Sequence, residues 1–293
     1  MPPPLRPGDV IHVVAPSGPF DPTLAWLGIG WLARRFQVRF DRSAFHVTGY
    51  LAGHDQRRHR ELQAALDDAA CRAVVAIRGG YGLNRIAHDL DWRRFEQAPK
   101  WIVGFSDVTA LHVECTSLGI MSMHASMAAH LGRGDERTRS SWLSALETPT
   151  EPRVFEGLAS WIEGEAEGTI AGGNLTLLHA CAVAGRLCIP NDALLFIEDI
   201  GERPYRIDRM LTTLRVGGHL RGVRGVVVGQ FTDSPPGPDR VTVEDALRAS
   251  LAPLGVPVVA GLRAGHGEPN EPVMLGARAR IEARGDGSVV RVG

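Results

Sequence analysis

The segment Trp101-Ile102-Val103-Gly104-Phe105-Ser106-Asp107-Val108-Thr109-Ala110-Leu111-His112 joins an apolar run to a helical pattern across one short turn. The run 101–103 is typical of a strand that is buried on both faces, as in a parallel sheet. After Ser106, apolar residues such as Val108 and Leu111 recur at helical spacing, and Ser and Asp are preferred helix N-caps. The serine therefore lies where a strand passes into a helix, and there the helix dipole and backbone amides favour a developing negative charge.

This segment differs from the G-x-S-x-G nucleophile elbow. Val108 stands two residues after Ser106, where that motif has glycine. An ordinary helix N-cap serine explains the local pattern as well as a nucleophile does. The segment by itself leaves both interpretations open.

A second glycine cluster follows another apolar run. Residues 73–77 are typical of a buried strand, and Arg78-Gly79-Gly80-Tyr81-Gly82 comes directly after them. Closely spaced glycines allow positive φ angles and let backbone amides face a ligand. Such a loop suits a phosphate or one half of an oxyanion hole, although its spacing matches neither G-x-G-x-x-G nor a Walker loop. A dinucleotide-binding fold and a plain strand-to-helix turn remain alternatives.

Strand and helix patterns alternate through the first half of the chain. Apolar runs predict strands at 10–14, 73–77 and 101–105, and helical spacing predicts helices from Pro22, over 56–70, after Asn84 and from Asp107. This alternation favours an α/β fold with a parallel sheet covered by helices. Ligands of such sheets bind at the carboxyl ends of the strands, where Gly80 and Ser106 are both expected.

The second half has a mixed α/β pattern after a polar, irregular stretch. We expect an N-terminal Rossmann-like parallel-sheet domain at 1–150, a linker region at 151–168 and a mixed α/β C-terminal domain at 169–293. Within the C-terminal part, the pattern predicts strands at 194–197, 225–229, 256–260 and 277–283, and helices at 175–183, 205–216 and 243–254.

Composition excludes several classes of protein. The formal net charge of −1 gives no basic field for nucleic acid. No stretch approaches the roughly 18 consecutive apolar residues of a membrane helix, and the first residues have no apolar export core. The four cysteines form no C-x-x-C pair, which favours reduced thiols over a zinc site. We expect a cytoplasmic protein with neither a nucleic acid nor a membrane as partner.

Glu198 and His266 are further candidates. Glu198 follows the apolar run 194–197, and His266 lies in the glycine-flanked loop Gly265-His266-Gly267. A carboxylate can accept the Nδ1 proton of a histidine and so direct Nε2 toward a nucleophile. Two alternatives stay open at this point, a solvated acidic turn and a metal site that combines Glu198 and Asp199 with His266.

Ordered segments along nearly the whole chain carry a family resemblance. They are Pro7-Gly8-Asp9-Val10, Val14-Ala15-Pro16-Ser17-Gly18, Gly49-Tyr50-Leu51-Ala52-Gly53, Ala76-Ile77-Arg78-Gly79-Gly80-Tyr81-Gly82, Gly104-Phe105-Ser106-Asp107, Gly172-Gly173-Asn174-Leu175, Leu195-Phe196-Ile197-Glu198-Asp199-Ile200-Gly201-Glu202, Tyr205-Arg206-Ile207-Asp208-Arg209, Gly265-His266 and Leu275-Gly276. With these segments the chain resembles the LD-carboxypeptidase family of serine peptidases, which includes the microcin C self-immunity peptidases.

The resemblance implies a catalytic triad of Ser106, Glu198 and His266. We assign the oxyanion hole to the amides of Gly80 and Asp107, and substrate binding to Gly79 and Tyr81. The resemblance implies no metal and no cofactor, and it implies a homodimer.

The substrate implied is a murein tetrapeptide, from which a terminal D-alanine is cut from the L-centre of a diamino acid in cell-wall recycling. The alternative within the family is a microcin-C-type self-immunity amidase that acts on aminoacyl or peptidyl nucleotides. The alternative of another class is a non-catalytic binder of muropeptides or nucleotides.

Overall fold

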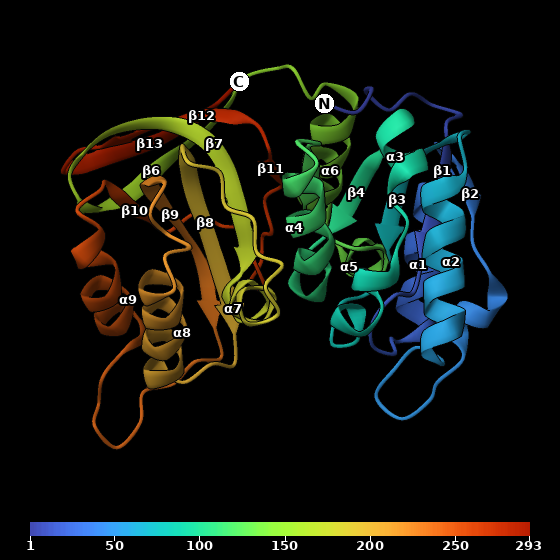
Figure 1. Ribbon diagram of the computed structural model, residues 1–293. Helices are drawn as coiled ribbons and strands as arrows, with labels where there is room; N and C mark the ends of the chain where they lie inside the picture. The colour runs from blue at the N-terminus through green and yellow to red at the C-terminus, as the bar shows by residue number, and fades with distance from the viewer. The chain divides into compact units, whose positions relative to one another are not determined.

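The computed structural model describes residues 1–293, apart from the side chain of Asp286, and divides into two compact units (Figure 1). The first unit comprises Met1–Pro149 and Glu271–Val273. The second comprises Thr150–Asn270 and Met274–Gly293. Each unit has its own sheet and its own apolar core.

The first unit is built on a sheet in the order β11-β5-β4-β3-β1-β2. Its strands are β1 (Val10–Val14), β2 (Gln37–Arg39), β3 (Cys71–Ala76), β4 (Trp101–Gly104), β5 (Ser122–His124) and β11 (Val273–Leu275), the last beginning in this unit. The pairs from β2 to β5 are all parallel. Every residue of β4 is buried, as expected for a central strand covered on both faces.

Helices alternate with these strands along the chain (Figure 1). They are α1 (Pro22–Leu32), α2 (Asp55–Asp67), α3 (Arg93–Gln97), α4 (Thr109–Ser117), α5 (Ala128–Arg133) and α6 (Glu136–Glu147). The α1 helix packs against α5, and the Asp21 carboxylate caps its first turn. This architecture confirms the expected α/β fold with a parallel N-terminal sheet.

The helix predicted after Asn84 is α3, but it does not begin at once. The chain there forms two short 3₁₀ turns, Leu83–Arg85 and Ala87–Asp89, and α3 begins only at Arg93. Side chains satisfy the backbone at this point, because Arg58 donates to the Gly82 carbonyl at 2.9 Å and the Leu83 amide donates to a buried carboxylate of Asp107 at 2.8 Å. The Gly82 carbonyl and the Leu83 amide are thus satisfied by side chains, so they do not require the hydrogen bonds of a continuous helix.

The second unit contains a closed barrel in the order β10-β6-β13-β12-β7-β8-β9. Its strands are β6 (Arg153–Ile162), β7 (Gly164–Asn174), β8 (Ala193–Ile200), β9 (Val223–Thr232), β10 (Val258–Ala260), β12 (Arg278–Ala283) and β13 (Asp286–Val292). Neighbours from β7 through β8 and β9 to β10 are parallel, and the other pairs are antiparallel.

Three helices accompany the barrel, namely α7 (Leu175–Val183), α8 (Pro204–Val216) and α9 (Val243–Leu251). The α8 helix packs against both α7 and α9 (Figure 1). Mixed strand directions with helices between the parallel strands agree with the predicted mixed α/β unit. None of the helices in the described part of the chain combines the length and apolar character needed to cross a bilayer.

Residues 151–168, expected to be a linker, form all of β6 and the beginning of β7. Most residues of these two segments are exposed or partly buried, which explains why the sequence there lacks a continuous apolar run. Glu165 also pairs with Arg280 and Arg284 at the neighbouring strand β12. These ion pairs join neighbouring strands and stabilise a region whose sequence lacks the apolar run by which the other strands were predicted.

Candidate active site

Ser106 follows β4 and starts the 3₁₀ turn Ser106–Val108, which leads directly into α4. Its φ angle is 61°, in the left-handed region that non-glycine residues rarely adopt. Holding such a residue costs on the order of 1–3 kcal/mol, and strain of this kind concentrates at functional sites. A sharp, strained strand-to-helix turn is also how the nucleophile elbow exposes its serine, although the glycine of that motif is absent here.

The glycine loop after β3 lies against Ser106. A Cβ atom on Gly79 would stand 2.9 Å from the Cβ and 3.2 Å from the Oγ of Ser106, and 3.3 Å from the Asp107 amide nitrogen. Only glycine fits at this distance, because real Cβ atoms essentially never approach so closely. The structure thus brings Gly79, Ser106 and the Asp107 amide together, as the sequence analysis expected of the carboxyl ends of neighbouring strands.

Gly80 occupies a conformation that suits an amide donor. Its φ angle is 104°, and the preceding carbonyl of Gly79 accepts a hydrogen bond from the Gly18 amide at 3.0 Å. Because a trans peptide is planar, the Gly80 N–H points the opposite way from that carbonyl. Next to it, the side chain of Tyr81 is 50% exposed, and its ring makes an edge contact with Tyr50.

The Asp107 side chain has a role that the sequence analysis missed. Its carboxylate is fully buried and accepts the Leu83 amide, so it ties the turn after β4 to the glycine loop. Burial raises the pKa of Asp107 to about 6, while the nearby Ser17 hydroxyl and the hydrogen bond from the Leu83 amide act in the opposite direction. Asp107 therefore positions the loop with its side chain and has its backbone amide beside Gly79.

Glu198 and His266 are paired in the second unit. The Nδ1 atom of His266 lies 2.8 Å from the Oε2 atom of Glu198, whose side chain is completely buried in β8. The imidazole is 14% exposed. A carboxylate accepts only, so Nδ1 carries the proton of the neutral ring and Nε2 keeps its lone pair. This is the arrangement of a general base held by an acidic residue.

The loop that carries His266 is anchored on both sides of the histidine. The Gly265 amide donates to Oδ1 of Asn270 at 3.0 Å, and the Gly267 amide donates to Oε1 of Gln230 at 3.0 Å. A Cβ on Gly265, whose φ angle is 135°, would stand only 2.8 Å from Oε2 of Glu198. The sequence alone pointed only to Gly265 and Gly267, because they flank the histidine. Nothing in the sequence singled out Gln230 or Asn270.

Asp199 does not join the Glu198–His266 pair. Its carboxylate accepts hydrogen bonds from Asn174 Nδ2 at 3.0 Å and from the Thr176 amide and hydroxyl at 2.8 and 2.9 Å. Burial and the adjacent charge of Glu198 raise the pKa of Asp199 to about 6. Successive residues of a strand face opposite sides, which explains this separation. Across the described residues, no three His, Cys, Asp or Glu side chains cluster as metal ligands would.

The candidate residues thus form two half-sites. The first unit contributes Ser106, the glycine loop and the Asp107 amide, and the second contributes Glu198 and His266. Each half-site is assembled from segments far apart in the sequence. A nucleophile with nearby amides and a base oriented by a carboxylate are the kinds of functional group that acyl transfer needs.

Comparison with known proteins identifies the family. The model of the LD-carboxypeptidase N-terminal domain matches residues 11–125, and that of the LD-carboxypeptidase C-terminal domain matches residues 167–281. The chain belongs to the LD-carboxypeptidase family. This confirms the resemblance drawn from the ordered sequence segments.

Relatives and solved structures agree with this assignment. A Bacillus subtilis protein named "probable murein peptide carboxypeptidase" is 32% identical over 298 residues, covering 99% of this chain and 93% of its own. The crystal structure of muramoyltetrapeptide carboxypeptidase from Oxalobacter formigenes has a TM-score of 0.87 and 28% identity, covering 97% of this chain and 98% of its own. The microcin C7 self-immunity protein MccF, solved with aspartyl sulfamoyl adenosine, has a TM-score of 0.88 at 20% identity, covering 98% of this chain and 97% of its own. At that identity the likeness to MccF concerns the fold alone.

Proposed function

We propose that this chain is a serine carboxypeptidase that removes the terminal D-alanine from murein tetrapeptides. The family assignment supports carboxypeptidase chemistry, and the names of two similar proteins support a murein peptide substrate. The observation that carries the serine mechanism is the strained φ angle of 61° at Ser106, in contact with a glycine loop. An ordinary N-cap serine has an extended backbone and needs no such strain.

In the proposed mechanism His266 acts as the general base. With Glu198 accepting the Nδ1 proton, Nε2 of His266 takes the proton of Ser106 while Oγ attacks the carbonyl carbon before the terminal D-alanine. This step requires the two half-sites to meet, with Nε2 within hydrogen-bond distance of Oγ. The protonated His266 then gives its proton to the leaving amine, and water, activated by the same histidine, hydrolyses the acyl-enzyme.

The oxyanion is proposed to be held by the amides of Gly80 and Asp107. The nearness of the Asp107 nitrogen to Gly79, and the direction of the Gly80 N–H away from Gly18, both support this assignment. Preformed donors of this kind act without reorganisation, and loss of one typically costs about 100- to 1,000-fold in rate. Gly79 then serves substrate binding by leaving room beside Ser106, and the exposed ring of Tyr81 offers a contact for the peptide.

Ser106→Ala tests this function. Purified parent protein is incubated with a murein tetrapeptide and, separately, with an aminoacyl-sulfamoyl adenylate, and products are read by mass spectrometry. We expect the parent to release D-alanine and Ser106→Ala to release none. Ser117→Ala is the matched control, because Ser117 is an exposed serine whose hydroxyl bonds only to the nearby Glu114 carbonyl, and it should keep full activity.

Other outcomes point to the other functions. Equal turnover by Ser106→Ala and the parent would remove the serine mechanism. Hydrolysis of the adenylate without release of D-alanine would favour the self-immunity activity. Binding of the tetrapeptide without turnover by any form would favour a non-catalytic binder.

We also propose, from the family resemblance, that the protein works as a homodimer in the cytoplasm. Light scattering on the purified protein should then give twice the chain mass of 31.7 kDa. A mass of one chain at assay concentration would contradict the dimer.

A further inference from the structure

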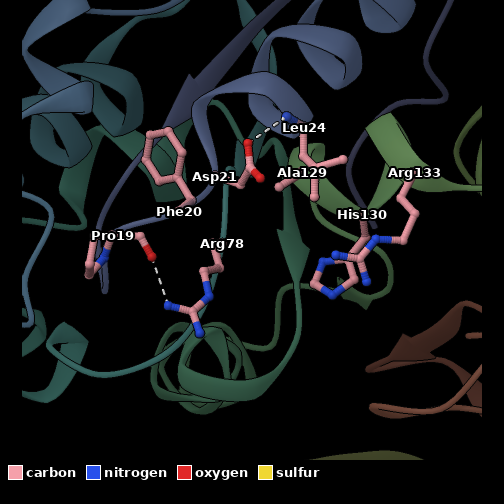
Figure 2. Close-up of a pocket in the computed structure, with 8 residues that line it drawn as sticks. All are labelled: Pro19, Phe20, Asp21, Leu24, Arg78, Ala129, His130 and Arg133. Atoms are coloured by element: carbon pink, nitrogen blue, oxygen red, sulfur yellow. Dashed lines mark hydrogen bonds between the residues drawn. The ribbon is translucent and has the colours of Figure 1, made fainter.

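A pocket of about 530 Å³ opens in the first unit (Figure 2). Its lining comes from three segments, the chain before α1 with the first turn of that helix, the loop after β3 and the α5 helix. The apolar part of the lining includes Phe20, Leu24 and Ala129. Arg78 and Arg133 contribute guanidinium groups.

Two contacts join this pocket to the serine turn. Arg78 is bonded to Gly79, which lies against Ser106. On another wall, the His130 ring packs at 5.0 Å, centroid to centroid, against the ring of Phe105, the residue before Ser106. The pocket is therefore lined by the immediate neighbours of the groups proposed to carry out the reaction.

The pocket offers an excess of positive charge. Arg78 and Arg133 are both exposed there, while the acidic residue of the lining, Asp21, has its carboxylate taken by the amides of Thr23 and Leu24 at the start of α1 (Figure 2). The negative charge of the Asp21 carboxylate is therefore partly compensated by the positive end of the α1 dipole, and the two arginines leave the pocket with a net positive charge.

The Arg78 guanidinium is held in place. Its Nη1 donates to the Pro19 carbonyl at 2.7 Å, drawn as a dashed line in Figure 2. One bond uses only part of the donor capacity of a guanidinium, and the planar fork matches a carboxylate. An anchored arginine loses less conformational freedom when it binds an anion than a mobile one does.

We propose that this pocket receives the leaving residue of the substrate and that Arg78 binds its terminal carboxylate. The inference rests on the proposed function and adds the reason why cleavage occurs only at the chain end. The terminal carboxylate is one residue from the scissile carbonyl, and Arg78 directly precedes the glycine that touches Ser106 while its side chain lines the pocket. Arg133 adds positive charge to the same pocket, and Leu24 and Ala129 face the side chain of the leaving residue.

A difference in selectivity follows from the size of the pocket. Its volume exceeds what a single methyl side chain fills, so contacts to that side chain contribute little. A charge-assisted hydrogen bond to the carboxylate contributes about 1.5–3 kcal/mol, which is roughly 10- to 100-fold in affinity. The enzyme should therefore tolerate a larger D-residue at the chain end and reject a peptide whose terminal carboxylate is replaced by a carboxamide.

The test compares a murein tetrapeptide with its terminal carboxamide. Binding of each is measured by calorimetry in the Ser106→Ala background, with and without Arg78→Gln, and kcat and KM are measured with Ser106 intact. We expect the carboxamide to bind about 10- to 100-fold more weakly when Arg78 is present and equally well in Arg78→Gln. Arg78→Lys should restore part of the preference, because it keeps the charge and loses the planar fork.

Arg72→Gln is the matched control. Arg72 is an exposed arginine of β3, the strand that precedes Arg78, and it lies outside the pocket, so this variant should keep the full preference for the carboxylate. A preference that survives in Arg78→Gln would overturn the assignment. Failure of the proposed function would give a different result. The protein would then cleave neither peptide, but it would still prefer the carboxylate in binding and would lose that preference in Arg78→Gln.

Discussion

Gly265→Ala tests whether the orientation of His266 by Glu198 affects the reaction rate independently of the stability of the loop that carries His266. A Cβ at this position would stand 2.8 Å from Oε2 of Glu198, whereas ordinary contact begins at 3.4 Å, so the carboxylate must move by about 0.6 Å (3.4 − 2.8). That movement acts on the atom that accepts the Nδ1 proton of His266. Since a misplacement of 1 Å can cost about 100-fold in rate, we expect kcat/KM to fall by about 10- to 100-fold.

Gly261→Ala is the matched control for this prediction. Gly261 also has a positive φ angle, 96°, but a Cβ there meets no atom within 4 Å. Both variants carry the backbone penalty of an L-residue at positive φ, on the order of 1–3 kcal/mol, and only Gly265→Ala adds the contact with Glu198.

The assay is kcat/KM on a murein tetrapeptide, with urea denaturation of both variants to measure the free energy of unfolding. Both variants should lose stability, Gly265→Ala more because of the added contact, and only Gly265→Ala should lose activity. Proton NMR of the hydrogen-bonded Nδ1–H should show a shift in Gly265→Ala only. Equal kcat/KM values for the two variants would refute the reasoning.

Four further predictions follow from the same structure. Ser106→Gly should be inactive and about 1 kcal/mol more stable than Ser106→Ala, because glycine relieves the φ strain; equal urea midpoints would contradict this. The raised pKa of Asp107, about 6 against 3.8 unfolded, makes the folded state bind more protons and lose stability as pH rises from about 4 to 6. The unfolding free energy of Asp107→Asn should therefore rise relative to the parent by about 2 kcal/mol between pH 4.5 and 7, and a constant difference would exclude this origin. Dialysis against a chelator should leave kcat/KM unchanged, and loss of activity that a divalent cation restores would show a metal requirement. A tetrapeptide ending in L-alanine should be spared while its D-alanine epimer is trimmed, since inversion displaces the carbonyl from attack distance; comparable cleavage of both would exclude LD-specificity.

The central strands β3 and β4 were predictable because burial on both faces leaves an apolar run, whereas the short strands β2, β5 and β11 were not predicted. Residues 73–77 and 101–105 overlap β3 and β4 within one or two positions. The strand ends then placed Gly80 and Ser106 at one edge of the sheet, since parallel strands share that edge. The contact between Gly79 and Ser106 agrees with this reasoning.

Other features depend on tertiary contacts that the local pattern does not contain. The apolar residues of β6 are interrupted by polar residues and glycine, so they form no continuous run, and the turns after Gly82 form where Arg58 and Asp107 satisfy the backbone. The supports of His266, Gln230 and Asn270, come from β9 and from the end of the loop, and neither amide side chain has a distinctive local signal. A single sequence also cannot assign the Arg78 side chain to a pocket, because the pocket walls come from α1 and α5.

Direct detection of the acyl-enzyme tests the central claim most closely, that Ser106 attacks with His266 as base and Glu198 as its orienting partner. The protein is mixed with a murein tetrapeptide, quenched in acid within milliseconds to seconds, digested and analysed by mass spectrometry. The account predicts a transient mass increase equal to the tripeptide acyl group on the peptide that contains Ser106, strongly reduced in His266→Ala and Glu198→Gln. Release of D-alanine without any adduct on Ser106, or an adduct on another residue, would contradict it.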